Sequence, residues 1–392
     1  MKKKILMLGG AHSQIPAIQY ARAAGYHVLT CDYLPDNPGH QYAHQSFNVS
    51  TTDKEKVLQL AREQDIDGIV AYASDPSAPA AAYVCDALRL PGASYRAVRT
   101  LAEKDLFRAF LRDNGFNYPA FHSLSAVTEA DRLDNLDYPV FVKPVDSSGS
   151  KGITCVDSPV DLPAAVDYAF QFSRCHRVIV EANVTSPYQQ LHGDGFVYDR
   201  ELVFLGLCDH HFKEAAPVAS TFPAQIDQRL TEAVFQAVQR VIRQVGYASG
   251  AINVEARVSG DQQVYIMEIG PRSGGNYVPQ LMACGTGFDE VAAIVDTAMG
   301  RQPEIKTWPV RQHCLQYIVG AGQSGVLAGI DCSKAFQDKI VQLYQQRRAG
   351  DAVHAYHNSA DVVGVVIARC RDAADLRQTM AEIKSHVRVV VR

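Results

Sequence analysis

The first 95 residues alternate short apolar segments with segments of helical period, and this alternation restricts the fold more than any other feature of the chain. An apolar run at 4–8 ends at Gly9 and Gly10, and apolar residues then recur at helical spacing until Gly25. Strands are predicted at 4–8, 27–31 and 68–71, and helices at 15–24 and 54–64. Alternating strands and helices build a parallel sheet with crossover connections. Residues 1–96 are therefore predicted to form an open parallel α/β domain.

A second region begins after Pro91 and Gly92, where strands follow one another with fewer helices between them. Strands are predicted at 138–144, 177–181, 195–207, 250–258 and 264–269, and helices at 97–114, 227–245 and 287–300. This order is typical of an α+β fold. We expect a domain at 97–305, divided into lobes at 97–180 and 181–305, and a small C-terminal α+β domain at 306–392. The last domain has its clearest strand at 362–368 and a helix at 373–385.

The composition excludes several classes of protein. The chain has 392 residues, 47% of them hydrophobic and 20% charged, which is the balance of a folded globular protein. Its formal net charge of -4 provides no overall positive field, so we expect neither nucleic acid nor a membrane as partner. The apolar runs are shorter than the roughly 18 to 20 residues of a membrane-spanning helix. Nine scattered cysteines without a Cys-x-x-Cys pair indicate reduced thiols and a cytoplasmic location.

The segment 142–153 places a lysine, Lys143, at the end of a strand and follows it with a loop of serines and glycines. Small residues let consecutive backbone N–H groups approach an anion, and a lysine adds a point charge for phosphate oxygens. A nucleoside triphosphate fits this pattern. The segment is not the usual P-loop, because Gly152 follows Lys151 where Ser or Thr is required. An exposed turn that closes a hairpin is the structural alternative.

Two glutamates, Glu255 and Glu268, lie on consecutive predicted strands that a short polar turn connects. If both point to the same face, their hard oxygen atoms suit magnesium. Each glutamate is flanked by apolar residues, and a carboxylate on a buried strand is costly unless it is paired or bound to a metal. Salt bridges to Arg257 or Arg272 are the alternative explanation. Arg272, beside two glycines, is also suited to bind phosphate or carboxylate oxygens through two N–H groups.

Together these motifs resemble the ATP-grasp superfamily, in particular its carboxylate–amine ligase group, with a layout similar to biotin carboxylase and carbamoyl phosphate synthetase. The resemblance covers most of the chain and implies a pre-ATP-grasp domain, an ATP-grasp fold and a small last domain. It implies that Lys104 and Lys143 bind ATP and that Glu255 and Glu268 bind the metal. It also implies that Arg272 and Lys143 are catalytic. The remaining nucleotide-binding residues that it implies are Ser147, Ser148, Gly149 and Gly152 over the phosphates, Glu181, Ala182, Asn183 and Val184 at adenine, and Gln190 at ribose.

Two positions depart from the family's pattern. Gly270 stands where the family usually has an asparagine that adds a metal ligand, and Gln190 stands where an acidic residue usually contacts ribose. A glutamine still forms hydrogen bonds to hydroxyl groups. We expect neither change to remove phosphate or metal binding, although a magnesium ion loses one ligand or takes a water in its place.

The resemblance implies an ATP- and Mg²⁺-dependent carbon–nitrogen ligase, with Mn²⁺ as an alternative metal. Such an enzyme joins a small-molecule carboxylate to an amine through an acyl phosphate and releases ADP and phosphate. Two alternatives stay open: a biotin carboxylase-like enzyme that activates bicarbonate, and a nucleotide-binding regulatory protein with reduced catalysis. A homodimer is a further expectation. The candidate substrate contacts are His12, Asp75, His210, His211, Gly274 and Gly275, with both histidines expected in a polar loop.

Overall fold

The first domain is a parallel sheet covered by helices, as its alternating sequence predicts. The computed structural model describes residues 2–213 and 216–392. The strand order is β3-β2-β1-β4, and every neighbouring pair in it is parallel. Its elements are β1 (Lys4–Leu8), α1 (Ile15–Ala23), β2 (His27–Asp32), β3 (Gln45–Asn48), α2 (Lys54–Gln64), β4 (Gly68–Val70) and α3 (Ala78–Leu88). Buried residues such as Leu6, Leu29 and Val57 join strands and helices in one core.

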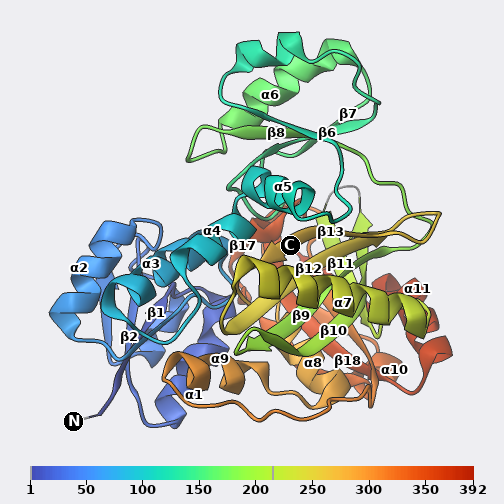
Figure 1. Cartoon of the computed structure of the whole chain (residues 1–392). Helices are drawn as coiled ribbons and strands as arrows, with labels where there is room; N and C mark the ends of the chain where they lie inside the picture. Colours follow the sequence, from blue (N-terminus) through green and yellow to red (C-terminus); the bar gives the residue numbers. More distant parts are fainter. Residues whose placement is uncertain (1, 214–215) are drawn as a thin grey trace.

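A small antiparallel sheet with the strand order β5-β8-β6-β7 forms a lobe that stands apart from the rest of the molecule (Figure 1). Its elements and the two helices that lead to it are α4 (Tyr95–Ala102), α5 (Lys104–Asp113), β5 (Phe121–Leu124), β6 (Val140–Pro144), β7 (Thr154–Val156), α6 (Leu162–Phe170) and β8 (Val178–Ala182). The single helix expected at 97–114 is therefore two helices. They meet at Glu103, whose extended backbone ends one helix and begins the next.

An eight-stranded antiparallel sheet forms the centre of the molecule, in the order β13-β12-β9-β10-β11-β14-β18-β16. Its elements up to residue 298, with the helices around them, are β9 (Gln190–Tyr198), β10 (Glu201–Lys213), β11 (Ala216–Phe222), α7 (Gln228–Val245), β12 (Gly250–Val258), β13 (Val264–Gly270), α8 (Val278–Thr286) and α9 (Glu290–Ala298). The predicted run at 195–207 is part of a hairpin, and the expected loop around His210 and His211 is the end of β10. The strand continues this far because its end pairs with β9 on one side and with β11 on the other.

The last 80 residues continue the central sheet and add a smaller one. Strands β14 (His313–Gly320), β18 (Val362–Cys370) and β16 (Ile340–Gln345) extend the central sheet beyond β11. A separate three-stranded sheet has the order β17-β15-β19. Its strands and the two remaining helices are β15 (Gly325–Cys332), α10 (Lys334–Gln337), β17 (Ala352–Val353), α11 (Ala373–His386) and β19 (Val387–Val391). The mixed α/β and α+β architecture predicted from the sequence is confirmed.

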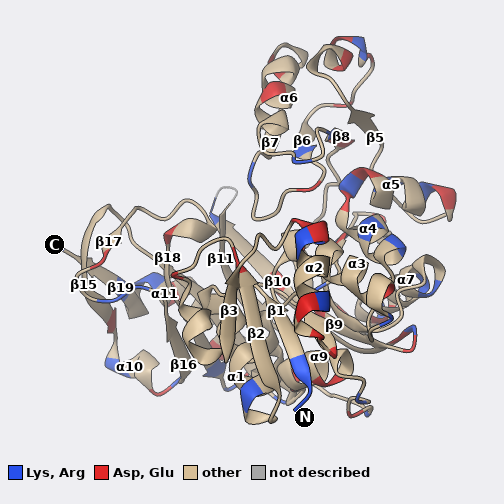
Figure 2. Cartoon of the chain, turned by 90° about the vertical axis from the view of Figure 1, so that its left-hand side faces the viewer, with Lys and Arg blue, Asp and Glu red and all other residues tan. Residues whose placement is uncertain are grey.

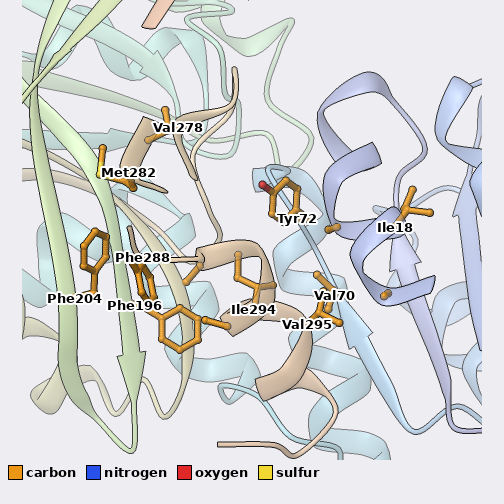
Figure 3. Packing of buried hydrophobic residues seen from close by; sticks show 14 of the residues in the cluster. Ile18, Val70, Tyr72, Phe196, Phe204, Val278, Met282, Phe288, Ile294 and Val295 are labelled. Carbon is orange, nitrogen blue, oxygen red and sulfur yellow. The ribbon is translucent and has the colours of Figure 1, made fainter. Parts of the chain in front are cut away.

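Helix α9 connects the first domain to the central sheet through a shared apolar core. Ile294 and Val295 of this helix lie between Val70 of the first domain and Phe196 of the sheet (Figure 3). All four are at most 9% exposed. Burying a side chain of this size stabilises a fold by about 1.5–3 kcal/mol, so this layer fixes the first domain against the sheet.

The surface carries both basic and acidic side chains, in agreement with the small formal net charge of -4. Basic and acidic segments lie next to one another on α2 and around the first domain (Figure 2). Within the two described ranges, no helix combines the length and apolar character needed to cross a membrane.

Candidate active site

A cavity of about 930 Å³ lies where the first domain, the small lobe and the central sheet meet. Its lining includes His12 and Asp75 from the first domain, Lys143 from the lobe, and Glu255 and Arg272 from the sheet and the loop after it. All predicted site residues line this cavity except Gly152, His211 and Gly274. Folding therefore gathers residues that lie far apart in the sequence into one site.

The two predicted metal ligands face each other. Glu255 of β12 and Glu268 of β13 are directly opposite in the antiparallel pairing. Burial, together with the charge of Glu268, raises the pKa of Glu255 to about 7. Lys104 Nζ lies 3.5 Å from a carboxylate oxygen of Glu268, and Gln190 donates to Glu255 over 2.9 Å. Two half-buried carboxylates that face each other across paired strands are stabilised by a divalent cation.

The donor set fits magnesium rather than a metal held by protein alone. In the described part of the chain, no group of three or more His, Cys, Asp or Glu side chains is arranged to hold a metal. Magnesium is usually bound by one or two carboxylates, with phosphate oxygens and water completing six ligands. Glu255 and Glu268 supply such a pair.

Both predicted ATP lysines point into the cavity and are held in place by neighbours. Lys104 opens α5, and its Nζ donates to the carbonyl oxygen of Ser147 over 2.9 Å. Lys143 of β6 is paired with Glu181 of β8, the neighbouring strand. The side chains of Lys104 and Lys143 are 12% and 17% exposed, so each is largely shielded from solvent but still borders the cavity.

Glu181, predicted at the adenine site, lines the cavity, and its carboxylate already has two cationic partners. Its carboxylate is buried between Lys143 and Arg108, whose Nε donates to it over 2.9 Å. Burial alone raises the pKa of Glu181, but these two cations outweigh that effect and lower it to about 2. The carboxylate is thus ionised and forms an ion pair with Lys143. The cavity wall beyond it is formed by Ala182, Asn183 and Val184.

The serine- and glycine-rich segment lines the cavity at residues 147–150 and again at Ile153. Ser147, Ser148 and Gly149 are lining residues. Gly152 instead lies against Phe172: a Cβ atom there would be 2.9 Å from the ring. Its φ of +75° and this close approach explain the glycine.

Several apolar residues that line the cavity are not among the predicted site residues, and Phe141, Ile153 and Met267 are three of them. Phe141 precedes Lys143 by two positions on β6 and therefore shares its face of the strand. Side chains alternate between the two faces of a strand with a period of two residues, and this alternation is the sequence signal that indicates Phe141. Apolar side chains of this kind form the walls between which planar rings bind.

Arg272 and Asp75 form an ion pair through two hydrogen bonds. Arg272 Nε and Nη2 each donate to a different oxygen of Asp75 over 2.6 Å. Its Nη1 donates to the carbonyl oxygen of Ser273 over 2.9 Å. Asp75, predicted as a substrate contact, lines the cavity but already has a protein partner.

The histidines divide between the two faces of β10. His210 lines the cavity and stacks on His192 of β9 with 3.9 Å between ring centroids. His192 shares a hydrogen bond of 2.7 Å with Ser220, and burial chiefly lowers its pKa to about 3, so this ring is neutral. His211 pairs with Thr221 instead, because consecutive residues of a strand point to opposite faces.

His192 was not among the predicted site residues, although it lies directly opposite Glu255 in the sheet. Only the strand register reveals this. Gly274 lies outside the cavity lining because its N–H faces away, donating to the buried Asp194 carboxylate over 2.8 Å. Gly275 does line the cavity.

Two protein families match separate segments of the chain. Residues 136–280 match the ATP-grasp domain family, and residues 318–392 match the L-amino acid ligase C-terminal domain 2 family. Formate-dependent phosphoribosylglycinamide formyltransferase of Mycobacteroides abscessus is 26% identical over 417 residues, which cover 98% of this chain and 96% of that protein.

Two solved structures have the same fold along the whole chain. The L-amino acid ligase of Bacillus licheniformis has a TM-score of 0.83 and 19% identity, covering 100% of this chain and 99% of that one. The biotin carboxylase domain of Hydrogenobacter thermophilus 2-oxoglutarate carboxylase, a dimer solved with MgADP and bicarbonate, has a TM-score of 0.80 and 15% identity, covering 100% and 91%. The predicted resemblance to ATP-grasp ligases is confirmed. Residues 136–280 thus form a segment of the ATP-grasp domain type, and residues 318–392 match the L-amino acid ligase C-terminal domain 2 family.

Proposed function

We propose that the protein is an ATP- and Mg²⁺-dependent ligase that joins a carboxylate to an amine through an acyl phosphate and releases ADP and phosphate. One observation carries this proposal. The paired carboxylates of Glu255 and Glu268 and the cationic groups of Lys104, Lys143 and Arg272 line one cavity. Such a set neutralises a triphosphate and the carboxylate that must approach it.

The chain's own residues have distinct tasks in this scheme. Ser147, Ser148 and Gly149 offer backbone N–H groups to the phosphates and cover them against water. Lys104 and Lys143 neutralise phosphate oxygens. Magnesium, held by Glu255 and Glu268, supplies charge neutralisation between phosphate groups.

The adenosine part of ATP is assigned to the strand end that follows Glu181. Ala182, Asn183 and Val184 supply backbone groups, and Phe141 and Met267 supply apolar walls for the ring. The ribose site is assigned to Gln190. Its amide is already oriented by Glu255 and by Arg257, which donates to Gln190 Oε1 over 3.2 Å.

In the first step, an oxygen of the substrate carboxylate bonds to the γ-phosphorus and the bond to ADP breaks. In the second, the amine nitrogen bonds to the acyl carbon, the bond from that carbon to the phosphate oxygen breaks, and the nitrogen loses a proton to water. Arg272 lies beside the metal carboxylates and stabilises the charge on the phosphoryl oxygens. The nucleophile in this step is a neutral amine. The cavity wall formed by His12, His210 and Gly275 is assigned to the two substrates.

The match of residues 318–392 supports amino acids as substrates, since the matched family is named for L-amino acid ligases. A cytoplasmic location and a homodimer complete the proposal. All nine cysteines are free thiols, and the biotin carboxylase domain with the same fold is a dimer.

The test is ADP release from purified protein with ATP and Mg²⁺, screened against pairs of amino acids, with mass spectrometry of the products. We expect ADP, phosphate and a condensed product in equal amounts, and no product when the amine is omitted. ADP release that needs bicarbonate alone would point to a carboxylase, which the likeness to a bicarbonate-bound biotin carboxylase domain makes the second candidate. Tight ATP binding without ADP release across the whole panel contradicts both.

A further inference from the structure

Asp75 reaches Arg272 from another domain. The two residues are 197 positions apart, and both hydrogen bonds between them are 2.6 Å long. A second bond nearby, from the backbone N–H of Ala73 to the Ser273 hydroxyl over 3.2 Å, joins the same two segments. Arg272 is 11% exposed and Asp75 is 26% exposed, so the pair is shielded but still borders the cavity.

Gly270 leaves the space into which Asp75 extends. A Cβ atom at position 270 would lie 2.9 Å from Asp75 Oδ1 and 3.3 Å from the guanidinium carbon of Arg272. The first distance is shorter than real Cβ contacts. Gly270 is not among the glycines with positive φ, so its backbone conformation does not require glycine. The space beside Asp75 does require glycine, because any side chain at position 270 would displace the Asp75 carboxylate.

We propose that Asp75 is a positioning residue for phosphoryl transfer: its carboxylate enters the space left by Gly270 and fixes the guanidinium of Arg272 toward the cavity. The inference rests on the proposed function of Arg272. It also accounts for the missing asparagine at position 270. An oxygen-bearing side chain does reach this place, but the first domain supplies it.

The hydrogen bonds of Arg272 show how the orientation is fixed. A guanidinium has five N–H groups. Three of them donate to Asp75 and to the Ser273 carbonyl, which fixes both the plane and the rotation of the group. Within the described chain, this leaves one N–H on each terminal nitrogen for phosphate oxygens. A donor held in place before the reaction needs no reorganisation during it.

The experiment uses Asp75→Asn, which keeps the size of the side chain but removes its charge. We expect the affinity ratio of AMP-PNP to ADP, measured by calorimetry with Mg²⁺, to fall about tenfold, since Arg272 is assigned to the γ-phosphoryl group. With an active substrate pair, kcat falls at least about tenfold while the KM for ATP changes less than about threefold. A wild-type affinity ratio and kcat in this variant overturn the proposal.

A double-mutant cycle tests the role of Gly270. Gly270→Ala should reproduce the loss in the wild-type background but have little further effect in Asp75→Ser, because no carboxylate is left to displace. Additive effects contradict the proposal. Glu201→Gln is the matched control, since Glu201 forms the same two-point pair with Arg243 on the surface and lies outside the cavity. Thermal unfolding of each variant identifies losses that are due to misfolding.

The two proposals fail separately. If the wild-type protein turns over no pair of acid and amine, the ligase function is wrong, and the AMP-PNP to ADP ratio still tests Asp75. If the wild-type protein is active and Asp75→Asn is equally active, the function stands and the positioning role is wrong.

Discussion

At the scale of single residues, charge pairing decides the chemistry of the cavity. Glu181 is fully engaged by Arg108 and Lys143, whereas Glu255 faces Glu268, a group of the same charge. A buried carboxylate with two cationic partners is satisfied by the protein, but two facing carboxylates require a ligand. The difference between the partners, rather than the residue type, separates Glu181 from Glu255 and Glu268, which we propose as the metal ligands.

Glu268→Gln should therefore abolish function without unfolding the protein. Loss of the charge weakens metal binding, and we expect the rate of ADP formation to fall at least about a hundredfold. Coupled-enzyme detection of ADP measures the rate, and thermal unfolding confirms the fold. Glu304→Gln is the control, because Glu304 is exposed and pairs only with Lys306 among its salt bridges in the described chain. Normal turnover in Glu268→Gln rules out the metal assignment.

At the scale of elements, the pairing of β9 with β10 brings His192, Gln190 and His210 to the cavity. The two strands approach so closely at Gly193 that a Cβ atom there would lie 1.8 Å from the carbonyl oxygen of Gly206. Backbone atoms of a paired strand cannot move aside as a flexible side chain can. The register of the site-bearing strands thus depends on one glycine.

Gly193→Ala should consequently lower the free energy of unfolding by about 3 kcal/mol, because the added methyl group separates the two strands. Urea denaturation measures the change. Gly260→Ala is the matched control: a Cβ atom at this turn has nothing within 4 Å, and we expect a change within about 0.5 kcal/mol. Equal stability of the two variants contradicts the close approach.

An ion pair ties Asp375 of α11 to Lys339, the residue before β16. The hydrogen bond from Lys339 and the backbone N–H of Arg371 lower the pKa of Asp375 to about 2. A carboxyl group whose pKa is lower in the folded state adds stability above its unfolded pKa, near 4. This contribution is lost as the pH falls from about 4 through the folded value.

Asp375→Asn should accordingly reduce the free energy of unfolding by about 1.5–3 kcal/mol at pH 7, and the difference from wild type should shrink between pH 4 and pH 2. Urea denaturation at a series of pH values measures it. Asp331→Asn, at an exposed position of β15, provides the comparison and should show no such trend. A difference that grows as the pH falls has the wrong sign for this ion pair.

At the scale of the whole molecule, the last segment is part of the central sheet rather than an appendage. β14 pairs with β11 along four residue pairs, and Cys314 and Ile367 belong to the same apolar core as Phe222 and Met282. Without β14, the N–H and C=O groups of β11 are left unpaired at a long sheet edge. The ATP-grasp sheet and the C-terminal strands should therefore fold together.

A chain that ends at residue 312 tests this. We expect it to aggregate, or to lose the cooperative unfolding transition of the full chain, because removal of β14 and β18 opens the apolar core. Size-exclusion chromatography and thermal unfolding give the result. A soluble truncated protein with a cooperative transition shows that the sheet is complete without these strands.

The sequence by itself determined the local structure and the chemical types in the site. Apolar runs and helical periods predict β1, β12 and α2 with their observed bounds. The sequence neighbours of Lys143, Glu255, Glu268 and Arg272 indicate groups suited to phosphate and metal. These features are local, because a strand or a helix depends on residues a few positions apart.

Tertiary structure alone decided which groups meet. It paired Glu181 with Arg108, placed His192 opposite Glu255, turned His211 away from the cavity and brought Asp75 into the space beside Gly270. It also joined the last strands to the central sheet. Each of these contacts depends on strand register or on domain packing between distant residues, and a single sequence carries no direct signal for either.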